Sequence, residues 1–266
     1  MEFEDKTALI TGAAGGIGHA VAKAFAREGA QLLLVDRDKV AGEAIAAELR
    51  DTGAIVRFIA ADVTRAADVA GYVQAALDAY GRIDCFHNNA GIEGKVAPTA
   101  EYDEAGFDAV IAVNVKGVFL GLRQVLPVML RQKSGAVVNT ASVAGLVGTP
   151  GMCAYVASKH AVIGLTKAAS GEVARSGVRI NAICPGPVET RMIRSLESQL
   201  DPANPESIHQ RYQSGIPSGR YTTPEEVAEI VLFLCADRAR NVNGAQWVID
   251  GARTAVGGAV TQMLGR

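Results

Sequence analysis

Two side chains with complementary acid–base chemistry, Tyr155 and Lys159, stand four residues apart in a stretch with helical periodicity. This spacing places both on one face of a helix. A phenol has an unperturbed pKa of about 10, and a neighbouring ammonium lowers it by favouring the phenolate. Ser142 ends a predicted strand and can hydrogen-bond an oxygen held beside the phenol. An isolated Tyr-x-x-x-Lys is also an ordinary helix pair, whereas the set predicts proton exchange with an alcohol or carbonyl oxygen.

A glycine-rich turn near the N-terminus has the form of a nucleotide site. The run Thr11-Gly12-Ala13-Ala14-Gly15-Gly16-Ile17-Gly18 follows a predicted strand and begins a predicted helix. Gly12 permits the tight turn, Gly16 brings the backbone close to a phosphate, and Gly18 lets the helix pack on the strand. The N–H groups at the helix start, that of Ile17 included, favour a pyrophosphate. The run lacks a Gly-Lys-Ser/Thr ending and so does not favour a nucleoside-triphosphate P-loop.

Asp36 follows the second predicted strand, 18 residues after Gly18. A carboxylate there accepts hydrogen bonds from the ribose hydroxyls of NAD and repels the 2′-phosphate of NADP. Arg37 is a candidate phosphate partner, but the adjacent carboxylate opposes that charge. We therefore predict that NAD is the cofactor and that Asp36 and Arg37 contact its adenosine half.

Two further strand ends carry candidate cofactor contacts. Asp62 and Val63 end the third strand, where a carboxylate can meet the adenine amino group. The run Asn88-Asn89-Ala90-Gly91 ends the fourth strand. Its small residues let the backbone pass close to a cofactor, and its amides can tie strand ends together. Taken singly, each of these runs is equally typical of an ordinary turn.

The composition is that of a folded protein, because 49% of the 266 residues are hydrophobic and 20% are charged. The net charge of −2 argues against a nucleic-acid surface. The four cysteines form no Cys-x-x-Cys pair and no ligand set with the four histidines, so we expect no metal site and reduced thiols in a cytoplasmic protein. The N-terminus lacks the order of a signal peptide, and Asn114 and Lys116 interrupt the best apolar run, which argues against a membrane span.

Short apolar runs alternate with longer Ala-rich helical stretches, which predicts a doubly wound parallel sheet in a single domain. The predicted strands are 7–11, 31–35, 55–60, 83–87, 136–141, 179–184 and 246–249; the predicted helices lie near 16–29, 38–51, 65–80, 103–131, 155–175 and 224–235. Thr64 and Thr223 are predicted helix caps. The strand-free stretch 187–222, with a short helix at 190–200, predicts a substrate lid at about 188–215. A passive surface loop is the alternative.

The motifs together resemble those of the short-chain dehydrogenase/reductase family over residues 5–252. They are Thr11-Gly12-x-x-x-Gly16-x-Gly18, Asn88-Asn89-Ala90-Gly91, Asn114, Ser142, Tyr155-x-x-x-Lys159 and Pro185-Gly186. The resemblance implies a Rossmann-type sheet of seven parallel strands and a homo-oligomer, with a tetramer favoured. It also implies that Lys159 binds the nicotinamide ribose, that Asn114 supports a proton relay, and that the carboxamide is contacted by Pro185, Gly186, Val188 and Thr190.

One position departs from the family pattern: Ala252 stands where the family often has the second glycine of Asp-Gly-Gly. The departure matters only if that position requires a positive φ. The tail from Thr254 to Arg266 has no family motif, and we expect it either to reach a neighbouring subunit or to fray.

The predicted substrate pocket lies between Ser142, Tyr155 and the lid. Its apolar candidates, each equally a candidate for the core, are Val143, Met152, Met192 and Leu196. Stretches at 88–95, 138–143, 200–205 and 217–221 resemble family members that interconvert cyclic secondary alcohols and ketones with NAD. We therefore expect an NAD-dependent oxidoreductase of a secondary alcohol, cyclic or aromatic. The alternatives are a 3-oxoacyl-thioester reductase and an inactive nucleotide-binding sensor or scaffold.

Overall fold

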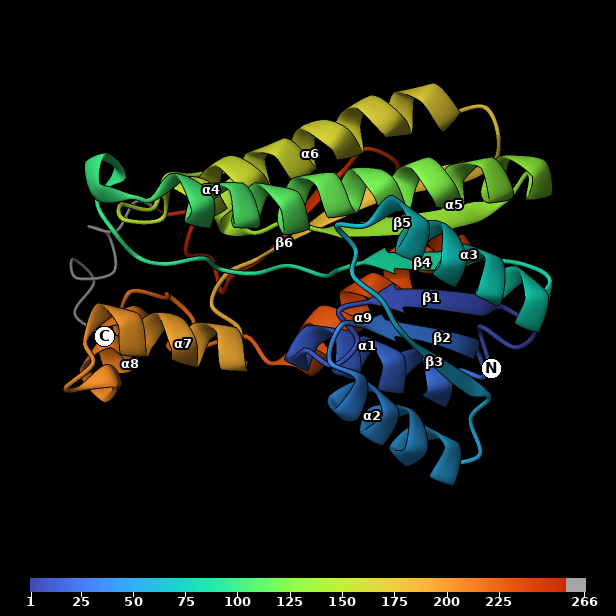
Figure 1. Ribbon diagram of the computed structural model, residues 1–266, viewed down its shortest axis with the longest axis horizontal. Coiled ribbons are helices and arrows are strands. Elements are labelled where there is room, and N and C mark those ends of the chain that lie inside the picture. The colour runs from blue at the N-terminus through green and yellow to red at the C-terminus, as the bar shows by residue number, and fades with distance from the viewer. Residues whose placement is uncertain (257–266) are drawn as a thin grey trace.

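Seven parallel strands form one sheet at the centre of the computed structural model, which describes residues 1–256 (Figure 1). The strands are β1 (Thr7–Thr11), β2 (Gln31–Asp36), β3 (Val56–Ala60), β4 (Cys85–Asn88), β5 (Gly135–Thr140), β6 (Val178–Pro185) and β7 (Gln246–Ile249). Their order is β3-β2-β1-β4-β5-β6-β7, so the direction of winding reverses between β1 and β4. The predicted doubly wound class and all seven predicted strands are confirmed, with ends that differ by at most two residues.

Helices cover both faces of the sheet (Figure 1). One face is covered by α1 (Gly16–Arg27), α2 (Lys39–Asp51) and α9 (Pro224–Cys235), and the other by α3 (Ala66–Tyr80), α5 (Val118–Gln132) and α6 (Cys153–Val173). Ala8 and Ile10 of β1 enter the first of these cores, and Leu9 enters the second. The strands therefore read as continuous apolar runs because both of their faces are buried.

The longest helix of the described chain runs from Glu104 to Gln132 and joins α4 (Glu104–Ile111), the π-helical η2 (Ala112–Gly117) and α5. By length and mean hydropathy alone, 1.5 over its most apolar window, it is long and apolar enough for a membrane span, so Asn114 and Lys116 do not interrupt the apolar run as expected. These two polar residues are too few to lower the average. The helix packs on α3, α6, β4 and β5, and its residues Val118 and Val125 belong to the core.

Two helices follow β6 outside the sheet, α7 (Arg191–Leu200) and α8 (Pro205–Ser214). Figure 1 shows both in orange, beside the carboxyl end of β6. The first matches the helix predicted at 190–200, whereas the second, which begins at Pro205, was not predicted. Asn204 caps α8 by accepting a hydrogen bond from Ser207 N at 3.2 Å, and Pro205 occupies the first helical position.

The two predicted caps have different outcomes. Thr223 caps α9 as expected and forms a full capping box with Glu226. The prediction for Thr64 was wrong, because α3 begins only after Arg65, which makes no side-chain cap. Thr64 N instead donates to the Asp62 carboxylate at 2.9 Å, and a charged acceptor competes well for such a donor. Of the predicted tail, residues 257–266 lie outside the described residues.

Candidate active site

A cavity of about 490 Å³ lies at the carboxyl ends of β1, β4, β5 and β6, next to the point where the winding reverses. Open α/β sheets bind their ligands at this point. The cavity brings together most of the residues singled out from the sequence: Gly12, Gly16, Ile17, Asp36, Arg37, Asn89, Ala90, Gly91, Ser142, Val143, Met152, Tyr155, Lys159, Pro185, Gly186, Val188, Thr190, Met192 and Leu196.

Helix α6 presents Tyr155 and Lys159 to the cavity. Lys159 is buried, and its Nζ lies 5.4 Å from the centroid of the Tyr155 ring. The same ammonium donates to the Thr140 carbonyl at 2.8 Å, which fixes it to the end of β5. Ser142 lies two residues after the end of this strand, and its Oγ donates to the Pro185 carbonyl at 3.3 Å. The three side chains of the proposed proton chemistry therefore line one space on a rigid frame.

The sequence predicted that Lys159 lowers the pKa of the Tyr155 phenol. In the protein without a cofactor, the pKa of the phenol is raised instead. Burial raises the pKa of Tyr155 to about 12; a hydrogen bond with Ser142 lowers it, and the charge of Glu93 raises it further. Burial also lowers the pKa of Lys159 to about 8, so its charge is weakened at the same time. Removal from water thus outweighs the attraction between phenolate and ammonium. In the protein by itself the phenol is a proton donor near neutral pH.

Asn114 is buried and does not line the cavity. Its Oδ1 accepts from Ile92 N at 2.8 Å, and its Nδ2 donates to the Ile92 carbonyl at 2.9 Å and to Ser158 Oγ at 3.0 Å. A Cβ built on Gly91 would lie 3.3 Å from Asn114 Oδ1 and 3.6 Å from Lys159 Nζ. The amide and the ammonium therefore both lie close to the backbone of Gly91.

Asn89 ties the end of β4 to the glycine-rich turn. Its Nδ2 donates to the carbonyls of Thr11 at 3.1 Å and Gly12 at 3.3 Å, and its Oδ1 accepts from Thr140 Oγ1 at 3.1 Å. Since Thr140 donates to Asn89, it accepts at 2.9 Å from His87 Nε2, which assigns the proton to that nitrogen. These side chains hold three strand ends together, as the sequence predicted for the amides.

The glycine-rich turn leaves the start of α1 open to a ligand. Gly12 has φ +65°, and a Cβ there would come within 2.9 Å of Ala90 Cα. Within the described part of the chain no side chain caps α1, which leaves its first backbone N–H groups available. Asp36 is oriented by two backbone donors, with Ala14 N at 2.9 Å and Asp38 N at 3.0 Å from its carboxylate. The geometry provides donors for a phosphate beside an acceptor for hydroxyls.

Three of the predicted cofactor residues do not line the cavity: Gly18, Asp62 and Val63. Gly18 serves packing, as the sequence predicted, because a Cβ there would meet the Gly12 carbonyl. The Asp62 carboxylate is engaged by Thr64 N, and this hydrogen bond lowers its pKa. Val63 is buried against Gly117 of η2. Within residues 1–256 no cluster of His, Cys, Asp or Glu forms a metal site.

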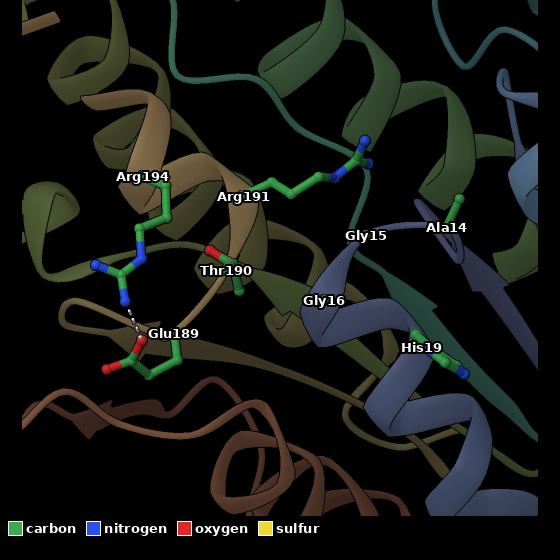
Figure 2. Close-up of a pocket in the computed structure, with 8 residues that line it drawn as sticks. All are labelled: Ala14, Gly15, Gly16, His19, Glu189, Thr190, Arg191 and Arg194. Carbon is green, nitrogen blue, oxygen red and sulfur yellow. Dashed lines mark hydrogen bonds and ion pairs between the residues drawn. The ribbon is translucent and has the colours of Figure 1, made fainter. Parts of the chain in front are cut away.

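A second hollow, of about 370 Å³, lies between the glycine-rich turn and the start of α7. Figure 2 shows two arginines of α7 with different surroundings. Arg194 points to Glu189, with Nη2 at 3.1 Å from the carboxylate, and also pairs with Glu197 at 3.2 Å. The Arg191 side chain extends toward the side of Gly15, and no acid among the described residues pairs with it. Arg191 therefore brings a positive charge to the edge of the turn.

Apolar side chains form the walls at the substrate end of the cavity. Met152 and Leu196 are buried in a small cluster that also includes Tyr212 of α8. Arg253 was missed from the sequence, because it belongs to no motif and lies far from the reacting groups along the chain; Tyr212 lies within the predicted lid but was not singled out. Ala252, next to Arg253, has φ +71°, so the position that departs from the family pattern does require the left-handed conformation. That conformation costs an alanine about 1 kcal/mol.

The family is identified by comparison with known proteins. The family model described as short chain dehydrogenase matches residues 6–201. Levodione reductase from Leifsonia aquatica is 46% identical over 255 residues, which cover 95% of this chain and 96% of that protein. The 2-(S)-hydroxypropyl-CoM dehydrogenase 3 from Xanthobacter autotrophicus is 41% identical over 96% of this chain and 98% of its own. The chain therefore belongs to the short-chain dehydrogenase family and is an oxidoreductase acting on CH–OH groups, as the sequence motifs had indicated.

Solved structures agree with this assignment. The crystal structure of levodione reductase superposes with a TM-score of 0.94 at 45% identity and covers 96% of this chain and 100% of its own. The structure of NAD⁺-bound xylitol dehydrogenase gives a TM-score of 0.90 at 35% identity, over 94% of this chain and 100% of its own. The Rossmann-type sheet predicted from the resemblance is thus confirmed.

Proposed function

We propose that the protein is an NAD-dependent dehydrogenase that interconverts a secondary alcohol, cyclic or aromatic, with its ketone. The observation that carries the proposal is that Ser142, Tyr155 and Lys159 line the same cavity as the glycine-rich turn and Asp36. Levodione reductase, which shares 46% identity, and the NAD⁺-bound xylitol dehydrogenase support the reaction class and the cofactor by similarity. The 188–215 segment would serve as the substrate lid.

The residues present fit NAD. The uncapped start of α1 and the Cβ-free approach at Gly12 and Gly16 suit the pyrophosphate. The oriented carboxylate of Asp36 suits the adenosine ribose hydroxyls and disfavours a 2′-phosphate. Pro185, Gly186, Val188 and Thr190, which line the cavity at the end of β6, would contact the carboxamide, and Lys159 the second ribose. Arg37, Asn89 and Ala90 complete these walls.

NAD, when bound, supplies the positively charged ring that accepts a hydride. The residues of the chain supply the proton chemistry. In the ketone-to-alcohol direction Tyr155, whose pKa of about 12 keeps it protonated, gives its proton to the substrate oxygen, and Ser142 holds the same oxygen by a hydrogen bond. In the reverse direction Tyr155 first releases its own proton to the relay, and its phenolate then takes the proton of the alcohol; the charges of Lys159 and of bound NAD⁺ would favour that phenolate. Asn114, fixed to Ile92 near Lys159, would hold the relay that carries the proton away.

The proposal is tested by measuring initial rates with NAD and with NADP across a panel of secondary alcohols that includes cyclohexanol. Reduction of an acetoacetyl thioester is measured for comparison. We expect NAD-linked oxidation of cyclic alcohols. Thioester reduction with NADPH alone would establish the carrier-linked alternative instead. NAD binding without turnover of any alcohol would favour a sensor or scaffold.

The proposal extends to the oligomeric state of the protein and to its cellular compartment. We expect a homotetramer, in which copies of the chain cover Phe119 and Leu130, exposed on α5. Light scattering in solution measures this directly. The four cysteines are free, three of them buried, which is typical of the reducing cytoplasm.

A further inference from the structure

The substrate end of the cavity contains a cation that the proposed reaction does not use. The charged residues that line the cavity are Asp36, Arg37, Glu93, Lys159, Arg191 and Arg253. Asp36 and Arg37 lie at the end proposed for the adenosine. Lys159 lies beside the phenol of Tyr155, and Arg191 lies at the glycine-rich turn. Glu93 and Arg253 remain; Glu93 acts on the pKa of Tyr155, whereas Arg253 has no role in binding the cofactor or in the proton chemistry.

A tight turn after β7 places Arg253 in the cavity wall. The Asp250 carboxylate accepts from Thr254 N at 2.8 Å and from Thr254 Oγ1 at 2.6 Å, and Arg253 N donates to the Asp250 carbonyl at 3.2 Å. The intervening Gly251 and Ala252 both have a positive φ. These bonds hold the alanine in a conformation it disfavours, so the direction of the next side chain is fixed by the fold.

The guanidinium reaches the wall that faces the substrate. Its central carbon lies 5.7 Å from the centroid of the Tyr212 ring in α8. Tyr212 packs in the same apolar cluster as Met152, Leu196 and Tyr155. A cation over an aromatic face is held in place while its N–H groups stay available. Arg253 is therefore positioned among the residues that would surround a substrate.

The charge of Arg253 is not neutralised by the described part of the chain. Two other arginines of this region are paired, Arg194 with Glu189 and Glu197, and Arg220 with Glu226. Among residues 1–256 no acid forms an ion pair with Arg253, although it is half-buried. A guanidinium with five fixed donors in a largely apolar site matches a carboxylate better than it matches a neutral ring.

Building on the proposed function, we propose that Arg253 binds an anionic group of carboxylate size on the substrate, away from the carbinol carbon. Glu93 supports one orientation of such a substrate, because it lines the cavity close to Tyr155 and repels an anion from the reacting end. The substrate class is then a cyclic or aromatic hydroxy acid and its keto acid. Apolar walls hold the ring, and the two charged residues determine which end faces the phenol.

A matched pair of ketones tests this proposal: 4-oxocyclohexanecarboxylate and its carboxamide, which differ in charge and hardly in shape. Their kcat/KM is measured with NADH for the wild type, Arg253→Met, Arg253→Lys and the control Arg211→Met, an exposed arginine beside Tyr212. We expect the wild type and the control to prefer the carboxylate by about 10- to 100-fold. Arg253→Met should remove the preference mainly through KM, and Arg253→Lys should keep part of it.

A binding measurement separates this inference from the proposed function. Calorimetric titration of cyclohexanecarboxylate and its carboxamide into the NADH complex reports on Arg253 without turnover. Equal affinity for the two in the wild type, or an unchanged preference in Arg253→Met, overturns the inference even if cyclic alcohols are oxidised. A carboxylate preference that Arg253→Met abolishes supports it, whatever the panel of alcohols shows.

Discussion

The reaction centre and the 188–215 segment are held in place by different means. At the reaction centre, backbone groups of the sheet and its loops fix the polar side chains, as with Lys159 on the Thr140 carbonyl and Asn114 on Ile92. In the 188–215 segment, side chains hold one another around the buried Glu197, which accepts from Tyr221 at 2.9 Å, His209 at 2.9 Å and Arg194 at 3.2 Å. The geometry of the reaction centre therefore follows from the fold. The geometry of the 188–215 segment depends on a few side chains, so substitutions there can change it while the fold stays the same.

The largest expected effect comes from the reaction centre. Tyr155→Phe removes the proton donor and leaves the scaffold intact, so kcat should fall by about 100- to 10,000-fold. NAD affinity, measured by calorimetry, should stay near the wild-type value because the glycine-rich turn is unchanged. Near-normal turnover in this variant would show that the phenol is not the acid–base group.

Asp36→Ala tests whether the cofactor preference also comes from a group fixed by the backbone. The variant loses the acceptor for the ribose hydroxyls and the repulsion of a 2′-phosphate, so the ratio of kcat/KM for NAD over NADP should fall by about 10- to 100-fold. Asp38→Ala, which changes a carboxylate that caps α2, is the matched control. Equal rates with NAD and NADP in the wild type would contradict this assignment.

Glu197→Gln tests the other region. The neutral amide keeps the shape but weakens its bonds to Arg194, His209 and Tyr221, which should let α7 shift together with Met192 and Leu196. We expect KM to rise by about tenfold with a smaller change in kcat, because Tyr155 is untouched. Glu229→Gln, in an exposed pair with Arg27, should change neither. A loss confined to kcat would show that the two regions are not independent.

The smallest effect is on stability in acid. Burial lowers the pKa of His87 to about 3, from 6.5 in the unfolded chain. The unfolded state therefore binds a proton between these values while the native state does not, and stability falls as the pH drops below 6.5. Each pH unit should remove about 1 kcal/mol from the free energy of unfolding in urea. His87→Gln should flatten the dependence of the free energy of unfolding on pH, whereas replacement of the exposed His160 should leave that dependence unchanged. Equal slopes in His87→Gln and the wild type would exclude His87 as the source.

Sequence reasoning predicted which residues come together at the proposed reaction centre, because they lie in motifs at strand ends and on one helix face. Ser142, Tyr155 and Lys159 all line the cavity, as do Gly12 and Asp36. Other features are set by the folded structure and cannot be read from the spacing of residues. Asp62 follows its strand as expected, yet its carboxylate is engaged by Thr64. Arg253 lies 98 residues beyond Tyr155 in a turn that only the folded chain brings to the cavity. The direction of the shift in the pKa of Tyr155 depends on burial, which spacing does not reveal.

The π-helical turn of η2 lets the longest helix of the described chain pack on two sets of neighbours with two differently oriented faces. A π turn holds one residue more than an α turn, so it rotates everything after it by roughly 100°. The stretch before it packs mainly on α6, whereas the stretch after it packs mainly on α3, β4 and β5. Loss of one residue between Ala112 and Gly117 would restore a regular helix and misalign one of these two contacts. The number of residues in this short segment is therefore as constrained as their identity.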